Sequence, residues 1–488
     1  MATTPIIVWF RQDLRLADNR TLTAALATGR PVLPVYILDD ATAGVWKRGS
    51  ASRWWLHHSL TSLTKDLSDV GAPLVLRRGD TAEQLATLAS ETNATSVYCS
   101  RSYEPWAVRL ETALKDTLAK ASIELKRFSG VLLKEPETIR TQAGDPFKVY
   151  TPYWRALNVT GAPALAVARP SAIKAVKTKV ATDKLKDWAL LPVRPDWAGG
   201  MRDAWQPGEA GAKDNLNRFL DEALTGYSEM RNRPDKTGTS RLSPHLHFGE
   251  ISPHQCWHAA AARAAERTGT SDKGLEVFHK ELVWREFSYN LLIHWPDLPE
   301  KPFRKEFTAY PWSKDSKSLK AWQRGATGYP IVDAGMRELW HTGWMHNRVR
   351  MVVASFLIKH LLIPWQQGEA WFWDTLVDAD LASNAASWQW VAGSGADAAP
   401  YFRIFNPITQ GETFDPDGLY VRRWVPEIAG LPNDVLHAPW TAPPAILAAS
   451  DVELGRTYPL PIVDHAYARE RALAGYESVK AATASRAP

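Results

Sequence analysis

The chain has 488 residues, of which 45% are hydrophobic and 23% are charged. This length exceeds what one ordinary core supports, so we expect two domains, and the composition excludes a disordered or collagen-like chain. The formal net charge of +5 allows a polyanionic partner without requiring one. The only two cysteines, Cys99 and Cys256, exclude a disulfide framework and a cysteine-rich metal site, and they favour a reducing compartment.

The N-terminus does not have the charged region and long apolar run of a signal peptide. The longest apolar stretch, residues 351–365, is interrupted by Lys359 and His360, which favours a buried helix over a membrane span. We therefore expect a cytoplasmic protein that does not contact a membrane.

The first 128 residues alternate between short β-rich runs and amphipathic helical patterns. The β-rich runs are residues 5–10, 31–38, 73–78, 96–100 and, more weakly, 123–128. The helical patterns between them are residues 20–28, 53–70, 81–92 and 105–121. This alternation predicts a Rossmann-like α/β domain with a parallel sheet, which binds ligands beyond the carboxyl ends of its strands. It contains neither G-x-G-x-x-G nor a Walker A sequence.

The composition changes after this region. Residues 158–213 are rich in Ala, Pro and Lys and have little apolar periodicity, which indicates a long interdomain connection. Beyond it, apolar residues recur every three or four positions, which predicts an all-α domain. The segments with this spacing are residues 215–230, 252–269, 274–295, 331–343, 347–363, 369–378 and 464–479. The predicted domains are residues 1–130 and 214–488, joined by a linker at 131–213.

Hydroxyl side chains gather before one helical segment. Thr237, Thr239, Ser240 and Ser243 surround Arg241. Backbone N–H groups, hydroxyls and a guanidinium can form a phosphate cradle. Ordinary N-capping by Ser and Thr is the alternative, and it is favoured when this stretch is taken alone.

The stretch 279–292 is the second candidate. In a helix, Glu281, Trp284 and Arg285 share a face and could grip a planar ligand. The alternative is a surface pair of Glu281 and Arg285 with Trp284 in the core.

The third candidate is the stretch 344–351. A helix aligns Asn347 with Met351 and His346 with Arg350, which suits a flat aromatic ligand with a phosphate. A core role for Met351 is the alternative.

The fourth candidate is the stretch 377–390, where Asp378 and Asp380 precede small residues and Asn384. With neither a histidine nor a third carboxylate nearby, we expect ribose, ring-nitrogen or arginine partners and no metal site. Together the four stretches predict one site for a large aromatic, phosphate-bearing cofactor in the helical domain.

Long motifs in these regions resemble the DNA photolyase/cryptochrome family. They include "VWFRQDLRLADN", "GTSRLSPHLHFGEISP", "ELVWREF", "TGWMHNRVRMVVASFL" and "DADLASNAASWQWVAGSGADAAPYFRIFNP". Within the family the chain is most similar to bacterial cyclobutane pyrimidine dimer (CPD) photolyases of the group near plant cryptochromes, as "VYTPYWRAL" and "LLPVRPDWAGGM" indicate.

This resemblance implies FAD in the helical domain. The residues that it implies on the phosphate side are Tyr227, Thr239, Ser240, Arg241, Leu242 and Ser243, and those around the flavin and ribitol are Arg285, Arg350, Asp378 and Asp380. Asn384 is implied to face flavin N5, where plant cryptochromes carry Asp, so it favours repair over signalling.

Tryptophan is abundant, with 23 in the chain. The resemblance implies that Trp388, Trp365 and Trp312 carry electrons from the protein surface to the flavin, and that Trp284 stacks on the lesion. We expect many others, such as Trp371 and Trp373, to be core residues.

The implied activity is that of a lyase, the light-driven opening of a CPD that is flipped out of DNA. Reduced FAD would donate an electron to the dimer and recover it. The implied residues in contact with the dimer or the DNA are Arg231, Glu281, Trp284, Asn347, Arg348, Met351 and Gln410. Met351 is significant because (6-4) photolyases carry a catalytic His at this position.

The resemblance also implies an antenna chromophore in or against the α/β domain. Methenyltetrahydrofolate is favoured over an 8-hydroxy-deazaflavin, and no residue is assigned to it. We expect a monomer. The alternatives are a cryptochrome-type blue-light receptor, a (6-4) photolyase and an electron-transfer flavoprotein.

Overall fold

The computed structural model describes residues 4–266, 273–397 and 402–484. Parts of the predicted segment 252–269 and of the motif that spans residues 378–407 lie outside the described residues. The chain divides into two compact units. The first unit is Met1–Thr225, Ser240–Pro296 and Val377–Asp380, and the second is Gly226–Thr239, Asp297–Leu376 and Leu381–Pro488. The predicted domain boundaries at 130 and 213 stay a prediction.

The first unit is built on a five-stranded parallel sheet with the order β3-β2-β1-β4-β5. The strands are β1 (Ile6–Phe10), β2 (Val32–Leu38), β3 (Val75–Arg78), β4 (Ser96–Ser100) and β5 (Glu124–Phe128). The predicted parallel α/β architecture is therefore confirmed, and each strand lies within its predicted run. The local signal sufficed because buried parallel strands are short apolar runs between helices.

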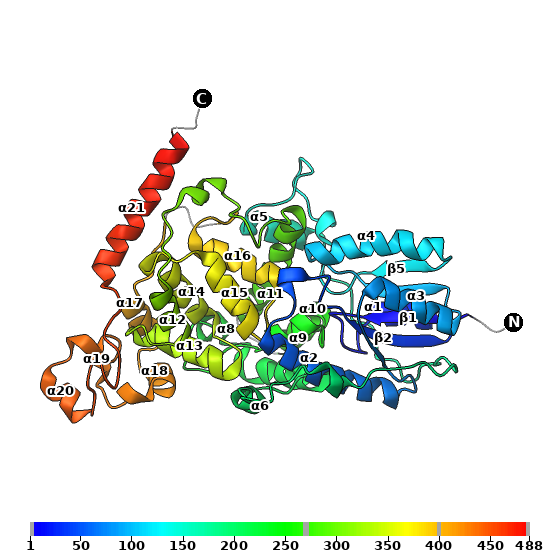
Figure 1. The fold of residues 1–488 in the computed structure, drawn as a ribbon, viewed down its shortest axis with the longest axis horizontal. Helices are drawn as coiled ribbons and strands as arrows, with labels where there is room; N and C mark the ends of the chain where they lie inside the picture. Colours follow the sequence, from blue (N-terminus) through cyan, green and yellow to red (C-terminus); the bar gives the residue numbers. More distant parts are fainter. Residues whose placement is uncertain (1–3, 267–272, 398–401, 485–488) are drawn as a thin grey trace. The chain divides into compact units, whose positions relative to one another are not determined.

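Four helices connect these strands (Figure 1). They are α1 (Arg20–Leu26), α2 (Ser50–Asp69), α3 (Thr81–Thr92) and α4 (Pro105–Lys120). One face of the sheet packs against α3 and α4, where Ile7, Val35 and Val97 meet Leu88 and Leu118 in one buried cluster. Right-handed crossovers explain this arrangement, because the chain reverses direction along the sheet after β3.

The long segment after β5 is ordered and packs on the sheet. Its helical elements are a 3₁₀ turn Pro136–Thr138, α5 (Tyr150–Val159), a 3₁₀ turn Leu185–Trp188 and α6 (Gly199–Ala204). Val32 N–H donates to the Lys174 carbonyl and Asp183 N–H to the Leu76 carbonyl, both at 2.8 Å. This packing explains how so long a connection stays ordered with little regular structure.

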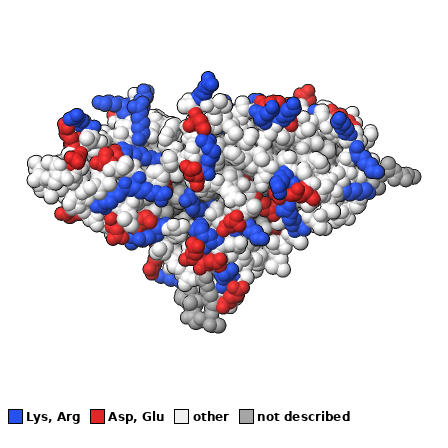
Figure 2. Space-filling model, turned by 90° about the horizontal axis from the view of Figure 1, so that it is seen from below, with Lys and Arg blue, Asp and Glu red and all other residues white. Residues whose placement is uncertain are grey.

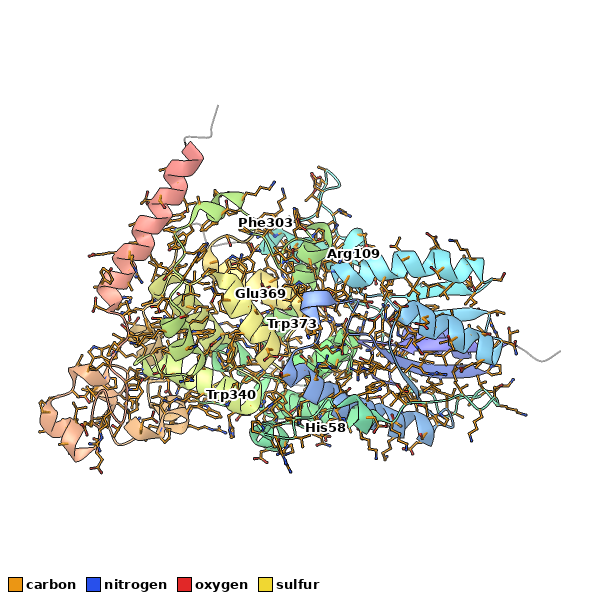
Figure 3. All side chains as sticks on the ribbon, viewed as in Figure 1. His58, Arg109, Phe303, Trp340, Glu369 and Trp373 are labelled. Carbon is orange, nitrogen blue, oxygen red and sulfur yellow. The ribbon has the colours of Figure 1, made fainter. Side chains whose placement is uncertain are left out.

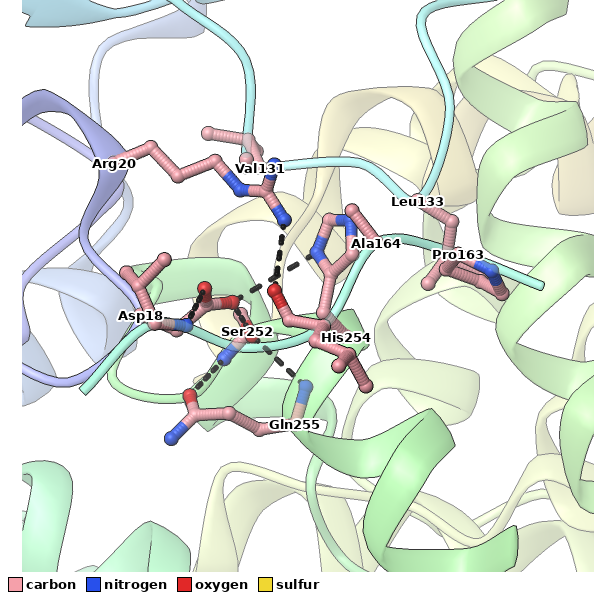
Figure 4. A network of polar contacts seen from close by, with 12 residues as sticks. Asp18, Arg20, Val131, Leu133, Pro163, Ala164, Ser252, His254 and Gln255 are labelled. Atoms are coloured by element: carbon pink, nitrogen blue, oxygen red, sulfur yellow. Dashed lines mark hydrogen bonds and ion pairs between the residues drawn. The ribbon is translucent and has the colours of Figure 1, made fainter.

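Helices that follow this long segment also belong to the first unit. They are α7 (Glu209–Arg218), a π-helical turn Phe219–Ala223, α9 (Ser243–Phe248), α10 (Pro253–Ala265) and α11 (Lys273–His294). Figure 4 shows how α10 is tied to the loop after β1: Ser252 caps the helix in a capping box with Gln255, and its hydroxyl donates to the Asp18 carboxylate. His254 Nδ1 lies 3.8 Å from the same carboxylate. These contacts hold α10 against the α/β core, and α10 packs on α11, the helix that carries Glu281 and Trp284.

The described residues of the second unit form helices and turns, as predicted. The helices are α8 (Tyr227–Met230), α12 (Ser316–Gln323), α13 (Pro330–Thr342), α14 (Asn347–Ser355), α15 (Trp365–Thr375), α16 (Leu381–Ala392), α17 (Pro407–Phe414), α18 (Leu419–Trp424), α19 (Asn433–Leu436), α20 (Pro444–Ala449) and α21 (His465–Ala484). A π-helical turn, Phe356–His360, continues α14.

The apolar stretch 351–365 is buried within this unit. Lys359 is 1% exposed, and its ammonium donates to the Arg403 carbonyl at 2.7 Å. Burial lowers the pKa of Lys359 to about 7. In the part of the chain that is described, no helix is long and apolar enough to cross a bilayer.

Charged side chains of both signs lie interspersed over the face shown in Figure 2. This mixture agrees with the modest net charge of +5.

Candidate functional site

Helix α11 presents three of the predicted site residues on one side. Glu281, Trp284 and Arg285 lie one turn apart, and all three are half-buried rather than enclosed in the core. The interpretation of Trp284 as a plain core residue is therefore wrong. A partly exposed indole beside a carboxylate can stack on a flat ring while the carboxylate accepts a hydrogen bond from the edge of that ring.

One face of the Trp284 indole is covered by the first residue of α5. The Tyr150 and Trp284 rings are parallel within 4°, with 3.7 Å between their centroids. Tyr150 Oη donates to the Lys280 carbonyl at 2.8 Å. Phe287 meets both rings edge-on. The plane of the indole is thus defined by two aromatic neighbours, Tyr150 from α5 and Phe287 from α11.

Arg285 is held by groups of the first unit. Its guanidinium donates to the Val131 carbonyl at 3.0 Å and lies over the Tyr289 ring. Burial lowers the pKa of Arg285, but the nearby Tyr289, Glu286 and Asp380 raise it more, so the net pKa is raised. Arg285 therefore remains a cation.

Asp380 lies among polar groups of the same unit. Tyr289 Oη donates to its carboxylate, and His247 Nδ1 lies 3.6 Å from the same oxygen. Burial raises the pKa of Asp380, yet His247, Arg285 and the Tyr289 hydroxyl lower it further, so the pKa is lowered overall. A buried carboxylate that stays ionised can orient a cation or accept hydrogen bonds from a sugar hydroxyl. Asp378 is also buried.

The stretch before α9 has an unusual backbone. Arg241 adopts a φ of 53°, in the left-handed region that a non-glycine residue rarely enters, and its guanidinium lies 4.2 Å over the Trp205 ring. Leu242 is buried, and its N–H donates to Ser240 Oγ. Among the described residues no side chain caps the start of α9 at Ser243, so the N-capping interpretation is wrong. The strained backbone instead fits a loop shaped for a ligand.

Helix α14 begins with a buried histidine. His346 is 2% exposed, and its Nδ1 accepts from the Arg348 N–H, so its Nε2 carries the proton. Nε2 finds no hydrogen-bond partner in the described parts of the chain. Burial and the nearby Arg348, Arg350 and Arg231 lower the pKa of His346 to about 3, so the ring is neutral. A buried donor among arginines is an arrangement that favours an anion.

Arg348 contacts Asn232 and one other predicted site residue, Met351, in the second unit. Its guanidinium donates to Asn232 at 2.7 Å, and Met351 Sδ lies 3.8 Å from it. Burial and the charges of Arg231 and Arg403 lower the pKa of Arg348. Arg231 lies over the Tyr227 ring. Three arginines this close to one another favour a phosphate-bearing partner.

The remaining residues of this group differ in exposure. Asn347 is exposed and Met351 half-buried, while Arg350 donates to the Met345 carbonyl at 2.7 Å. Gln410 on α17 has a buried amide oxygen that is unpartnered among the residues described. An orphaned acceptor of this kind is a candidate contact for a ligand.

Asn384 on α16 is buried against α15. Its side-chain amide donates to the Glu369 carbonyl at 3.1 Å, which leaves the amide oxygen as the acceptor. The Glu369 side chain is 1% exposed, and its carboxyl oxygens are unpartnered among the described residues. Burial, with a smaller effect of Glu300, raises the pKa of Glu369 well above its usual value, so the group is a neutral acid. Glu369 and Trp373 lie on the same helix in Figure 3.

Trp388 packs closely against α15. A Cβ added to Gly368 would lie 2.1 Å from the Trp388 ring, so only glycine permits this approach. The centroid of this ring lies 5.0 Å from that of Phe372 and 6.3 Å from that of Trp322. Trp388 and Trp365 are both 2% exposed, and Trp312 is half-buried. Of these three tryptophans, Trp312 is therefore the one that is partly exposed.

Two tryptophans depart from their predicted role. Trp371 and Trp373 are half-buried and not core residues, because α15 turns Phe372 and Trp365 inward and these two outward. Trp371 stacks on Trp340, which is 58% exposed.

Several side chains of the site were not identified from the sequence: Tyr150, His247, Tyr289 and Glu369. Each acts through a contact between segments far apart in the chain, and no local motif marks it. In the described ranges no three His, Cys, Asp or Glu side chains group as a metal site needs.

Comparison with known proteins yields two family matches. Residues 6–171 match the DNA photolyase family model, and residues 278–478 match the FAD binding domain of DNA photolyase. The chain is 54% identical to the deoxyribodipyrimidine photo-lyase of Agrobacterium fabrum, over 99% of this chain and 100% of that protein. It is 39% identical to Cryptochrome-1 of Arabidopsis thaliana, over 95% of this chain and 69% of that protein. A solved class III photolyase from Agrobacterium tumefaciens is similar with a TM-score of 0.95 and 54% identity, over 98% of both chains.

Proposed function

The chain belongs to the DNA photolyase/cryptochrome family, and on this premise we propose that it is a photolyase that uses light to reverse cyclobutane pyrimidine dimers in DNA. One observation carries the proposal: the half-buried indole of Trp284 lies one turn from the Glu281 carboxylate on α11. An indole face and an adjacent acceptor suit a flipped-out pyrimidine, which offers a flat ring and N–H groups at its edge.

FAD is the cofactor that the matched FAD-binding domain calls for. We assign the phosphate side to Tyr227, Thr239, Ser240, Arg241, Leu242 and Ser243, and the flavin and ribitol to Arg285, Arg350, Asp378, Asp380 and Asn384. When bound and reduced, FAD supplies on excitation the electron that opens the dimer, and it recovers that electron afterwards.

The chain's own groups fit this cofactor. Asn384 donates one amide hydrogen to the Glu369 carbonyl, which orients its side chain, and its oxygen could accept the N5–H of a bound, reduced flavin. Arg285 and Asp380 keep their opposite charges, and both suit the polar edge of an isoalloxazine and its ribitol.

DNA binding divides between positioning and lesion contacts. Arg231 and Arg348 contact phosphates, because their charges repel one another until an anion lies between them. Gln410 offers its unpartnered amide oxygen to the DNA. The lesion itself contacts Glu281, Trp284, Asn347 and Met351.

Trp388, Trp365 and Trp312 would carry electrons inward to a bound, oxidised FAD, with a reductant in solution restoring the oxidised indole. Indoles oxidise readily, and the half-buried Trp312 is the member of the three that solvent reaches. This role concerns activation of the cofactor and leaves the dimer untouched.

Two other photochemical functions are possible in this family. A blue-light receptor is less favoured, since the photo-lyase of Agrobacterium fabrum is 54% identical and Cryptochrome-1 is 39% identical. A (6-4) photolyase is less favoured because Met351 occupies the position of that group's catalytic His.

The antenna, oligomeric state and location are further proposals. We infer methenyltetrahydrofolate as the antenna, with 8-hydroxy-deazaflavin as the alternative. The protein acts as a monomer in the cytoplasm, where its DNA substrate lies.

The test is light-dependent repair by the purified, chemically reduced holoprotein. One oligonucleotide carries a cyclobutane thymine dimer and a second carries a (6-4) product. Reversal of the first alone is the expected result. Reversal of the second alone would assign the (6-4) activity, and a photoreducible protein that repairs neither would be a receptor.

A further inference from the structure

Tyr150 lies flat against the indole that is proposed to receive the lesion. We propose that Tyr150 is a positioning residue, which fixes the plane of Trp284 so that the dimer extends a stack of tyrosine, tryptophan and pyrimidine. The inference rests on the proposed function and adds to it a residue from the segment between the sheet and the helices.

The geometry shows that Tyr150 itself is held in place. It is 7% exposed and begins α5, and its hydroxyl donates to the Lys280 carbonyl on α11 at 2.8 Å. The edge of Phe287 meets the Tyr150 ring at 77° and the Trp284 ring at 79°. The tyrosine therefore cannot slide along the indole without losing a hydrogen bond or an edge-on ring contact.

A fixed tyrosine restricts Trp284 in turn. An indole has two side-chain torsions. Rotation toward Tyr150 would drive the ring into the parallel tyrosine, whose centroid lies 3.7 Å away, and rotation in the other direction would lose the stacking contact. Trp284 nevertheless stays half-buried, so part of its surface is open while one face is covered. A platform fixed before the lesion arrives loses less conformational entropy on binding, which raises affinity without any new contact to the lesion.

The same helix offers a comparison residue. Tyr153 is fully buried on α5 and packs against Phe287 with ring centroids 5.4 Å apart. It supports the packing of α5 on α11, whereas Tyr150 stacks on the indole. Loss of Tyr153 thus reports general loosening of the two helices, and loss of Tyr150 reports the stack.

A double-mutant cycle tests the inference with the full-length, FAD-loaded protein. The variants are Tyr150→Leu, Trp284→Leu and the double variant, with Tyr153→Leu as the packing control. Dissociation constants are measured for an oligonucleotide with one thymine dimer and for the undamaged one. We expect Tyr150→Leu to weaken binding of the damaged strand about tenfold, with little change for the undamaged strand.

The second half of the cycle separates positioning from general stability. In the Trp284→Leu background, the Tyr150→Leu change should have an effect of less than about twofold, because the residue that it positions is gone. Tyr150→Phe, which keeps the ring, should restore damaged-strand affinity to within about threefold of the original protein. If Tyr150→Leu melts well below Tyr153→Leu, the cycle is run with Tyr150→Met, whose unbranched, flexible side chain adapts better to the space left by the ring.

The outcomes distinguish failure of the proposed function from failure of the positioning role of Tyr150. If the unaltered protein repairs no dimer, the proposed function fails. If it repairs the dimer and the tyrosine change has the same effect with or without Trp284, the positioning role is refuted. Equal losses for damaged and undamaged strands, as expected of Tyr153→Leu, would also refute it.

Discussion

The side-chain amide of Asn384 donates a hydrogen bond to the main-chain carbonyl of Glu369, 3.1 Å away. This bond determines which end of the amide is presented elsewhere, because the two amide hydrogens and the oxygen lie on opposite sides of the group. The chemistry assigned to Asn384 therefore depends on a neighbouring helix as much as on the residue itself.

Asn384→Asp should impair the reduced cofactor. A carboxylate in place of the amide cannot donate to the Glu369 carbonyl, and the two oxygens repel one another. We expect the reduced flavin to reoxidise in air about tenfold faster in the dark, with FAD still bound, which flavin absorbance measures. Asn406→Asp is the control, since its side-chain oxygen caps α17 and needs no amide hydrogen. Unchanged reoxidation would remove Asn384 from the flavin.

Trp388→Phe should separate photoreduction from repair. The change removes an oxidisable ring that packs against Gly368, so light-driven reduction of oxidised FAD should slow by about tenfold or more. Repair by enzyme that is chemically reduced beforehand should stay nearly intact. Trp54→Phe, a fully buried tryptophan of the first unit, is the control. Equal losses of photoreduction and repair would contradict the electron-transfer role.

Glu281→Ala should lower repair more than FAD content. One hydrogen bond to the lesion is lost, so we expect the repair rate per bound flavin to fall about tenfold. The measurement pairs flavin absorbance with dimer reversal. Glu276→Ala on the same helix removes an exposed partner of Lys280 and serves as the control. Loss of FAD with normal repair per flavin would place Glu281 away from the lesion.

Glu286→Gln should change the dependence of stability on pH. The Glu286 carboxylate accepts from Leu133 N–H at 2.8 Å, and burial raises its pKa from 4.5 to about 7. The raised pKa means that the folded protein holds the Glu286 proton more tightly than the unfolded chain does. The stabilisation that this proton contributes is therefore full below about pH 4.5 and is lost as the pH rises to about 7.

Glutamine does not titrate, so the variant should gain stability relative to the original protein over this window, by about 3 kcal/mol in total. Urea unfolding of both proteins at pH 5 and pH 8 measures the difference. Arg285→Lys, which keeps a neighbouring cation, shows whether charge alone sets the effect. Parallel pH profiles for Glu286→Gln and the original protein would mean that Glu286 ionises normally.

Local pattern was sufficient for much of the fold. The strand runs at 5–10 and 96–100 were predicted within a few residues because strands buried on both faces read as short apolar runs. The helical pattern at 274–295 was predicted because burial of one side imposes a period of 3.6 on a helix. The face shared by Glu281, Trp284 and Arg285 follows from the same helical period. The path of residues 158–213 along the sheet could not be predicted, since that segment is held by backbone hydrogen bonds that any sequence can make.

The sequence by itself determined the parallel α/β architecture, the helical character of the second half and the family, since periodicity and motifs reside in neighbouring residues. Only the tertiary structure decided that Tyr150 stacks on Trp284, that Tyr289 donates to Asp380, and that Glu369 is a buried neutral acid. Each of these depends on distant segments being packed together and dehydrated, and no local pattern records which distant segments meet.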